Sequence, residues 1–189
     1  MSWTTQLSRG CAALCLSLTA FAAQGAAAYS NMYVFGDSLS DSGNDLVLIG
    51  NVPSPTYFTD GTNVGRFTNG LNYADRLAAS FGLTLTPSVT GGNNYAHGGA
   101  RSEYVRPDLV PFGALSFNEQ IGTYLASSGG VMDPNALYVL WIGANDMADA
   151  LTKSLMLGGD LTPVGDESSQ TGGDIVTALG TLDTLGARN

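Results

Sequence analysis

Three short segments of this 189-residue chain place reactive or hydrogen-bonding residues directly after apolar runs. Ser38 follows the run at 31–35, the glycine pair Gly98 and Gly99 follows the segment at 91–96, and Asn145 follows the run at 136–142. A serine hydroxyl can attack a carbonyl once a base removes its proton. A glycine N–H and an asparagine amide can then hold the oxyanion that develops. Together the three segments predict acyl transfer through a serine nucleophile.

A layered α/β fold with a parallel sheet would bring these residues together. The segments at 31–35, 91–96 and 136–142 are predicted strands, and the last is apolar throughout, as buried central strands are. Helical patterns separate the runs, and strands that alternate with helices are typical of this fold class. Because the carboxyl ends of parallel strands meet at one edge of the sheet, functional groups collect there.

Four helices are expected from apolar periodicity and from capping residues, at 71–81, 116–128, 146–156 and 175–185. Ser116 and Glu119 form a capping-box pattern, and Gly82, Gly129 and Gly186 follow three of the helices. The intervening stretch at 158–173 is predicted to be an acidic loop. Residues 50–70, rich in Gly, Pro, Thr and Asn, are predicted to form a long surface loop.

The end of the chain is unusual for a parallel sheet. The helix at 175–185 has the position of a crossover helix, which delivers the chain into the next parallel strand. Only residues 187–189 follow it. We therefore expect the sheet to be incomplete at the C-terminus, with an exposed apolar edge strand and poor solubility for residues 29–189 alone.

Composition excludes several classes of protein. Seven basic and 16 acidic side chains give a net charge of −9 and a pI near 4.1, which argues against nucleic-acid binding. No stretch of about 20 apolar residues is present, so no transmembrane helix is predicted. With 25 glycines and 12% charged residues, the chain is not typical of disorder. These numbers indicate one acidic, globular domain.

Residues 1–28 have the pattern of a secretory signal peptide. Arg9 precedes an apolar run at 11–23, and small residues follow up to Ala28, the expected cleavage site. Cleavage after Ala22 is the alternative, and a buried N-terminal helix is the competing interpretation. The sequence thus predicts export, to the periplasm, the medium or the outer membrane. Both cysteines lie within the apolar run, so neither a redox pair nor a metal site is expected in the mature chain.

Four ordered segments resemble those of the GDSL family, also called SGNH hydrolases. They are FGDSLSDSGN at 35–44, GRFTNG at 65–70, NYAHGGA at 94–100 and WIGAND at 141–146. By this resemblance, Ser38 is the nucleophile and an oxyanion N–H donor, Gly99 (rather than Gly98) supplies a second N–H, and Asn145 donates its side-chain amide. The resemblance also implies a three-layer α/β/α, flavodoxin-like fold around about five parallel strands, small-molecule or lipid ester substrates, and no cofactor.

The chain departs from the family pattern at the base. The family has an Asp-x-x-His segment near its C-terminus, and these 189 residues contain no such segment. The chain is therefore interpreted as a signal peptide at 1–28 and a partial hydrolase domain at 29–189, inactive alone. Two alternatives remain: a non-catalytic lipid- or carbohydrate-binding remnant, and the passenger of an outer-membrane autotransporter esterase. The oligomeric state and the substrate are not predicted.

Several residues have a second interpretation. His97, the single histidine, is either a substitute base for Ser38 or a surface or rim histidine, and we expect the latter. Ser38 and Asn145 could each cap a helix instead of acting in catalysis, with a helix beginning near Ser38. Asp146 is expected to bond to nearby backbone. The acidic stretch at 160–174 is expected to be a solvated loop rather than a calcium site.

Overall fold

The computed structural model describes residues 29–50, 65–105, 107–108 and 110–189. The predicted signal peptide at 1–28 lies outside the described residues. So do 14 positions of the predicted surface loop, 51–64, which include a stretch at 51–60 whose aromatic residues could line an acyl groove.

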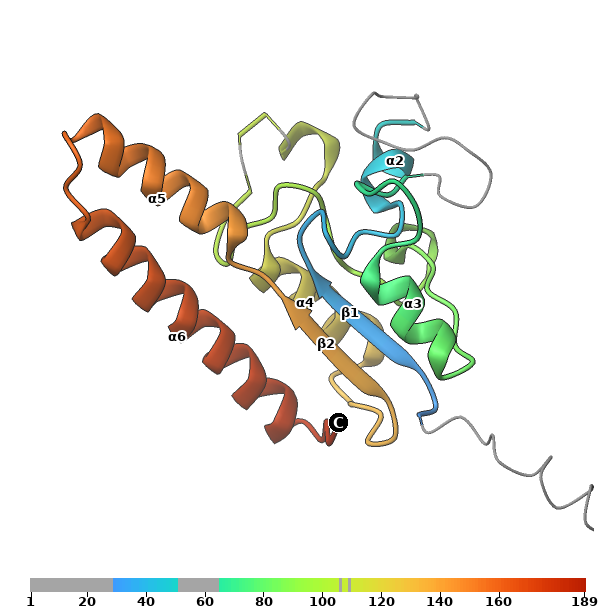
Figure 1. Ribbon diagram of the computed structural model, residues 1–189. Coiled ribbons are helices and arrows are strands. Elements are labelled where there is room, and N and C mark those ends of the chain that lie inside the picture. The colour runs from blue at the N-terminus through green and yellow to red at the C-terminus, as the bar shows by residue number, and fades with distance from the viewer. Residues whose placement is uncertain (1–28, 51–64, 106, 109) are drawn as a thin grey trace, which may run out of the picture.

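The described elements combine a parallel sheet with helices, which confirms the α/β fold class. In chain order they are β1 (Met32–Gly36), α2 (Asn44–Leu48), α3 (Tyr73–Ser80), the short 3-10 helices η2 (Ser88–Thr90) and η3 (Val110–Phe112), α4 (Phe117–Ser128), β2 (Leu137–Trp141), α5 (Ala144–Met156) and α6 (Thr162–Thr184). β1 and β2 pair in parallel, from Met32 opposite Leu137 to Gly36 opposite Trp141. Figure 1 shows the two strands side by side at the centre of the chain.

The predicted strand at 91–96 does not form as a regular strand, although it lies beside β1. The Val34 N–H donates to the Asn93 carbonyl (3.1 Å), and the Tyr95 N–H donates to the Val34 carbonyl (2.7 Å). Only one isolated parallel bridge, between Val34 and Asn94, results. The Asn44 side chain binds the carbonyls of Asn94 and Ala96, so a side-chain amide occupies backbone groups that a further strand would otherwise pair with.

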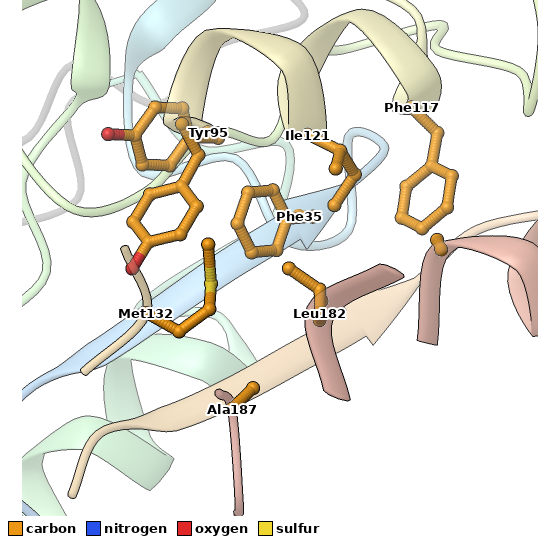
Figure 2. Packing of buried hydrophobic residues seen from close by; sticks show 9 residues of the cluster. Phe35, Tyr95, Phe117, Ile121, Met132, Leu182 and Ala187 are labelled. Carbon is orange, nitrogen blue, oxygen red and sulfur yellow. The ribbon is translucent and has the colours of Figure 1, made fainter. Parts of the chain in front are cut away.

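Helices cover both faces of the sheet because side chains of β1 alternate between them. Met32 and Val34 pack in a buried cluster with Ala74 and Ala78 of α3. Phe35 points to the opposite face, into a second cluster formed by α4, α6 and their neighbours. That cluster comprises Phe35, Tyr95, Phe117, Ile121, Tyr124, Met132, Ala178, Leu182 and Ala187. Figure 2 shows Phe35 between Ile121 of α4 and Leu182 of α6.

Three of the predicted helices form close to their expected limits. The reciprocal capping box of Ser116 and Glu119 starts α4, and Gly129 ends it in the left-handed conformation (φ 66°). A second reciprocal box, between Asn72 and Asp75, starts α3 and was not anticipated. α5 begins at Ala144, two residues before the predicted start.

The prediction of an acidic loop at 158–173 is wrong for most of that stretch. α6 runs from Thr162 to Thr184, and it lies alongside α5 (Figure 1). Its buried residues, Thr171, Ala178 and Leu182, follow a helical spacing, whereas Leu179 is 50% exposed. The acidic side chains of its first half leave few apolar residues for periodicity to detect. Within the described residues, no helix is apolar enough over its length to cross a bilayer, α6 included.

The predicted central strand is half-buried rather than buried. Four of the five residues of β2 are partly exposed, and Trp141 is 50% exposed. β1 covers one edge of β2, whereas at the other edge the Tyr138 N–H donates to the Asn189 carbonyl (3.0 Å). α6 therefore returns the chain to the outer edge of β2, as the crossover interpretation requires.

A buried glutamine completes the hydrogen bonding at the end of β1. The Gly36 N–H donates to Gln120 Oε1 (2.8 Å), and Gln120 Nε2 donates back to the Gly36 carbonyl (2.9 Å). Gln120 is fully buried on α4. Its amide thus links a helix to the last residue of the strand, much as a neighbouring strand would.

Gln120→Met is expected to destabilise the protein by about 1–3 kcal/mol, because it leaves the buried Gly36 N–H without an acceptor. Urea unfolding of the natural gene product measures this. Gln170→Met, at an exposed position of α6, is the matched control and should change stability by no more than about 0.5 kcal/mol. Equal effects of the two substitutions would contradict the assignment of Gln120 as a structural link.

Candidate active site

Ser38 lies in a tight turn directly after β1. The Ser40 N–H donates to the Asp37 carbonyl (3.0 Å), and the Leu39 N–H donates to Asp37 Oδ1 (3.0 Å). The next helix, α2, begins only at Asn44. A helix does not begin at Ser38, contrary to one interpretation, because the Asp37 side chain captures a backbone N–H and closes the turn. Ser38 itself is half-buried.

Two asparagine side chains form hydrogen bonds to the loop at 37–43, which carries Ser38. Asn94 Nδ2 donates to the Ser40 carbonyl (2.7 Å) and lies 2.7 Å from Ser42 Oγ. Asn72 Nδ2 donates to the Asp41 carbonyl (3.0 Å). Asn94 begins the family-like segment at 94–100, but no role was predicted for its side chain. The side chain is fully buried and anchors the loop that carries the candidate nucleophile.

Asp41 organises the start of α2. Its Oδ1 accepts the N–H groups of Gly43 and Asn44, both at 2.7 Å, and its Oδ2 accepts that of Asp45 at 3.2 Å. Burial and the charge of Asp45 raise the pKa of Asp41 to about 8, against the opposing effect of these three hydrogen bonds. A neighbouring carboxyl, Asp37, has its pKa raised as well, chiefly by burial.

Gly99 and Asn145 lie on segments that contact each other. Gly99 has a left-handed backbone (φ 73°), and Asn145 is the second residue of α5. Asn145 Nδ2 donates to the Ala100 carbonyl (2.9 Å), and the Ser102 N–H donates to Asp146 Oδ1 (2.8 Å). The bond to Asp146 confirms the predicted backbone contact. Asn145 does not cap α5, because Gly143 is the cap residue and no side chain caps that end.

His97 is a core residue, not the surface or rim histidine that we expected. Its side chain is fully buried, and Nδ1 lies 3.0 Å from Asp45 Oδ1. The adjacent Gly98 has no room for a side chain, because a Cβ there would lie 2.3 Å from Asp45 Oδ2. Among the described residues, His97 forms its hydrogen bond with Asp45 and none with Ser38.

The described residues contain no group of three or more His, Cys, Asp or Glu side chains arranged to hold a metal ion. The acidic stretch at 160–174 lies mostly in α6, so it is a helical surface rather than a loop. A second buried charge pair lies near α3, where Arg66 binds Asp75 through two hydrogen bonds of 2.6 and 2.9 Å.

Hydrogen bonds join the three candidate segments at one edge of the sheet. The Asp37 N–H donates to the Trp141 carbonyl (3.3 Å), which links the ends of β1 and β2. The His97 N–H donates to the Gly36 carbonyl (3.1 Å), which links the segment of Gly99 to β1. With the bond from Asn145 to Ala100, each segment contacts another. Ser38 and Asn145 thus follow the ends of the two paired strands, and the segment of Gly99 contacts both.

Comparison with known proteins gives one consistent result. The sequence model of the family described as "GDSL-like Lipase/Acylhydrolase" matches residues 32–173. Lipase 1 of Photorhabdus luminescens is 40% identical over 136 residues, which cover 72% of this chain and 18% of that protein. A GDSL esterase/lipase of Arabidopsis thaliana is 32% identical, covering 65% and 41%. The phosphatidylcholine-sterol acyltransferase of Aeromonas hydrophila is 32% identical, covering 69% and 37%. The chain spans less than half the length of these relatives.

The raised pKa of Asp41 predicts that stability falls as pH rises. The folded state holds the Asp41 proton up to about pH 8, whereas the unfolded chain releases it near the ordinary value of 3.8. The stability that the folded state gains from this bound proton is therefore complete below pH 3.8. It decreases as pH rises and is lost once the pH has passed through about 8. Urea unfolding at pH 5 and pH 8 should show a smaller loss for Asp41→Asn than for the unmodified protein. Equal losses in both proteins would contradict a raised pKa.

Proposed function

Because the chain belongs to the GDSL-like lipase/acylhydrolase family, we propose that it hydrolyses esters through Ser38 as the nucleophile. The observation that carries the proposal is the set of hydrogen bonds joining the segments of Ser38, Gly99 and Asn145 at one edge of the sheet. Acyl transfer needs a nucleophile next to donors that stabilise an oxyanion, and these three segments supply both.

The reaction has two steps. Ser38 Oγ attacks the ester carbonyl carbon while a base takes the hydroxyl proton. The carbonyl oxygen becomes an oxyanion, bound by the N–H groups of Ser38 and Gly99 and by the Asn145 amide. The ester C–O bond then breaks, the alcohol leaves with the proton from the base, and an acyl-serine remains. Water, activated by the same base, hydrolyses that intermediate to the acid and restores Ser38.

The base and its orienting carboxylate are proposed to come from sequence C-terminal to residue 189. The position of His97 supports this, since its side chain is fully buried and its Nε2 has no hydrogen-bond partner, Ser38 included, among the described residues. The bond between the Asn189 carbonyl and the outer edge of β2 supports it as well, because a following strand could continue that pairing. On the same proposal, residues 29–189 alone are inactive.

The proposed substrates are acyl esters, lipid esters included. The names of two relatives, a lipase and a phosphatidylcholine-sterol acyltransferase, support a lipid ester. Export is proposed on the pattern of residues 1–28, and the product would act in the periplasm, in the medium or at the outer membrane. A non-catalytic binding protein on the same scaffold is the alternative that the next experiment tests.

Ser38→Ala in the natural gene product should lower turnover of a short-chain nitrophenyl ester by about 10⁶-fold, because the nucleophile is lost. It should also abolish covalent labelling by a fluorophosphonate probe. Ser80→Ala, at an exposed position of α3, is the matched control and should keep both properties. An unmodified gene product that neither reacts with the probe nor hydrolyses esters would favour the non-catalytic alternative.

His97→Gln should keep turnover within a few-fold, because glutamine can still bond to Asp45 and a base elsewhere would be unaffected. Steady-state kinetics together with a thermal unfolding curve separate the effect on turnover from any loss of stability. A folded variant with turnover lowered by more than about 100-fold would assign His97 as the base instead.

A further inference from the structure

The segment at 99–102 is fastened to the first two turns of α5 by side chains of that helix. Asn145 holds the Ala100 carbonyl and Asp146 holds the Ser102 N–H, as described above. A third fastening lies between Arg101 and Asp149, which are 48 residues apart in the sequence. The proposed reaction gives this third contact no role, and no pattern in the sequence predicts it.

The Arg101 guanidinium bonds to two partners at once. Its Nε and Nη2 donate to the two Asp149 carboxylate oxygens, at 2.6 and 2.8 Å. Its Nη1 donates to the Gly99 carbonyl at 2.5 Å. The Arg101 side chain is only 4% exposed. Because a guanidinium is planar and its donors point in fixed directions, binding Asp149 with two of them fixes the direction of the third.

Tyr104 completes the arrangement around this ion pair. Its hydroxyl donates to Asp149 Oδ2 (2.9 Å), and its ring lies 5.5 Å from the Arg101 Cζ. Burial lowers the pKa of Arg101, but the hydrogen bonds and the charge of Asp149 raise it by more, so the net shift is upward. The guanidinium therefore stays charged.

The contact with Gly99 is the important one for an oxyanion hole. Gly99 has a left-handed backbone and no side chain, so packing around a side chain cannot fix its orientation. Arg101 holds its carbonyl, and Asn145 holds the carbonyl of the next residue, Ala100. The Asn145 amide is thus bound one residue beyond Gly99, and the carbonyl of Gly99 itself is bound by Arg101.

The rest of the segment is fixed separately, by α4. The Phe117 N–H donates to the Arg101 carbonyl (2.9 Å), and the Asn118 N–H donates to the Ser102 carbonyl (3.1 Å). These bonds hold the backbone of 101–102 without help from the guanidinium. The Ala100 N–H, on the same peptide group as the Gly99 carbonyl, also donates to the His97 carbonyl (3.3 Å). Loss of the Arg101 side chain would therefore remove one of the two bonds that orient this peptide group while the segment stays folded.

We propose that Arg101, held by Asp149, is a positioning residue: by binding the Gly99 carbonyl it orients the Gly99 N–H so that this group and the Asn145 amide can donate to the same oxyanion. This inference rests on the proposed function. A donor displaced by about 1 Å can cost about 100-fold in rate, so the expected effect lies on turnover rather than on substrate binding.

The test is steady-state kinetics of the natural gene product carrying Arg101→Met, Arg101→Lys, Asp149→Asn or Arg101→Met with Asp149→Asn. Each variant is assayed well below its own unfolding temperature, so that loss of stability does not enter. Arg188→Met is the control, because it removes an arginine from an exposed ion pair with Asp183. It should leave kcat and KM unchanged.

Arg101→Met is expected to lower kcat by about 100-fold with KM within about three-fold, since only the transition state carries the oxyanion. Arg101→Lys should lower kcat less than Arg101→Met does, because lysine keeps the positive charge but lacks the paired, planar N–H donors of arginine. The double variant should equal Arg101→Met, because the two residues act as one unit. The rate of labelling of Ser38 by a fluorophosphonate should fall in parallel.

A folded Arg101→Met protein with kcat within three-fold of the unmodified protein would overturn the inference. So would a rise in KM at constant kcat, which would indicate a role in substrate binding. An unmodified gene product that neither hydrolyses esters nor reacts with the probe would instead overturn the proposed function, and the inference with it. The two failures are thus distinguishable by the behaviour of the unmodified protein.

Discussion

The whole candidate site depends on the close approach of two backbones at Gly36. A Cβ at this position would lie 2.3 Å from the Trp141 carbonyl oxygen, so β1 and β2 can end together only where β1 ends in glycine. The Gly36 carbonyl also receives the His97 N–H, and the Gln120 amide binds both backbone polar groups of Gly36. Three segments therefore meet at one residue, and the candidate nucleophile lies two positions beyond it.

Around this junction, buried polar side chains take the place of additional sheet. Asp41, Asn44 and Asn94 are fully buried. Asp41 bonds to backbone N–H groups at the start of α2, and Asn44 and Asn94 bond to backbone carbonyls of a neighbouring segment. Buried amides and carboxylates stabilise a structure only when their partners are present, so they specify one arrangement of the loops. Arg101 is buried as well, and its ion pair with the partly exposed Asp149 lies between the segment of Gly99 and α5.

The features of this fold that depend on neighbouring residues could be predicted from the sequence, whereas those that depend on contacts between distant residues could not. The capping box at Ser116, the strand β2 and the glycine after α6 depend on short-range patterns, and each forms where it was predicted. The burial of β2, which depends on distant segments, was predicted wrongly. The first half of α6 was missed because acidic and small residues hide its helical period. The burial of His97 and the pair of Arg101 with Asp149 join residues about 50 positions apart, and no local pattern reports such contacts.

A crystal structure of the natural gene product after reaction with a fluorophosphonate tests the central claim most directly. The account predicts a phosphorus atom bonded to Ser38 Oγ. It also predicts that the phosphonyl oxygen accepts hydrogen bonds from the Gly99 N–H and from the Asn145 amide, at about 2.7–3.1 Å. An adduct on another residue would contradict the account, as would a phosphonyl oxygen directed away from both donors.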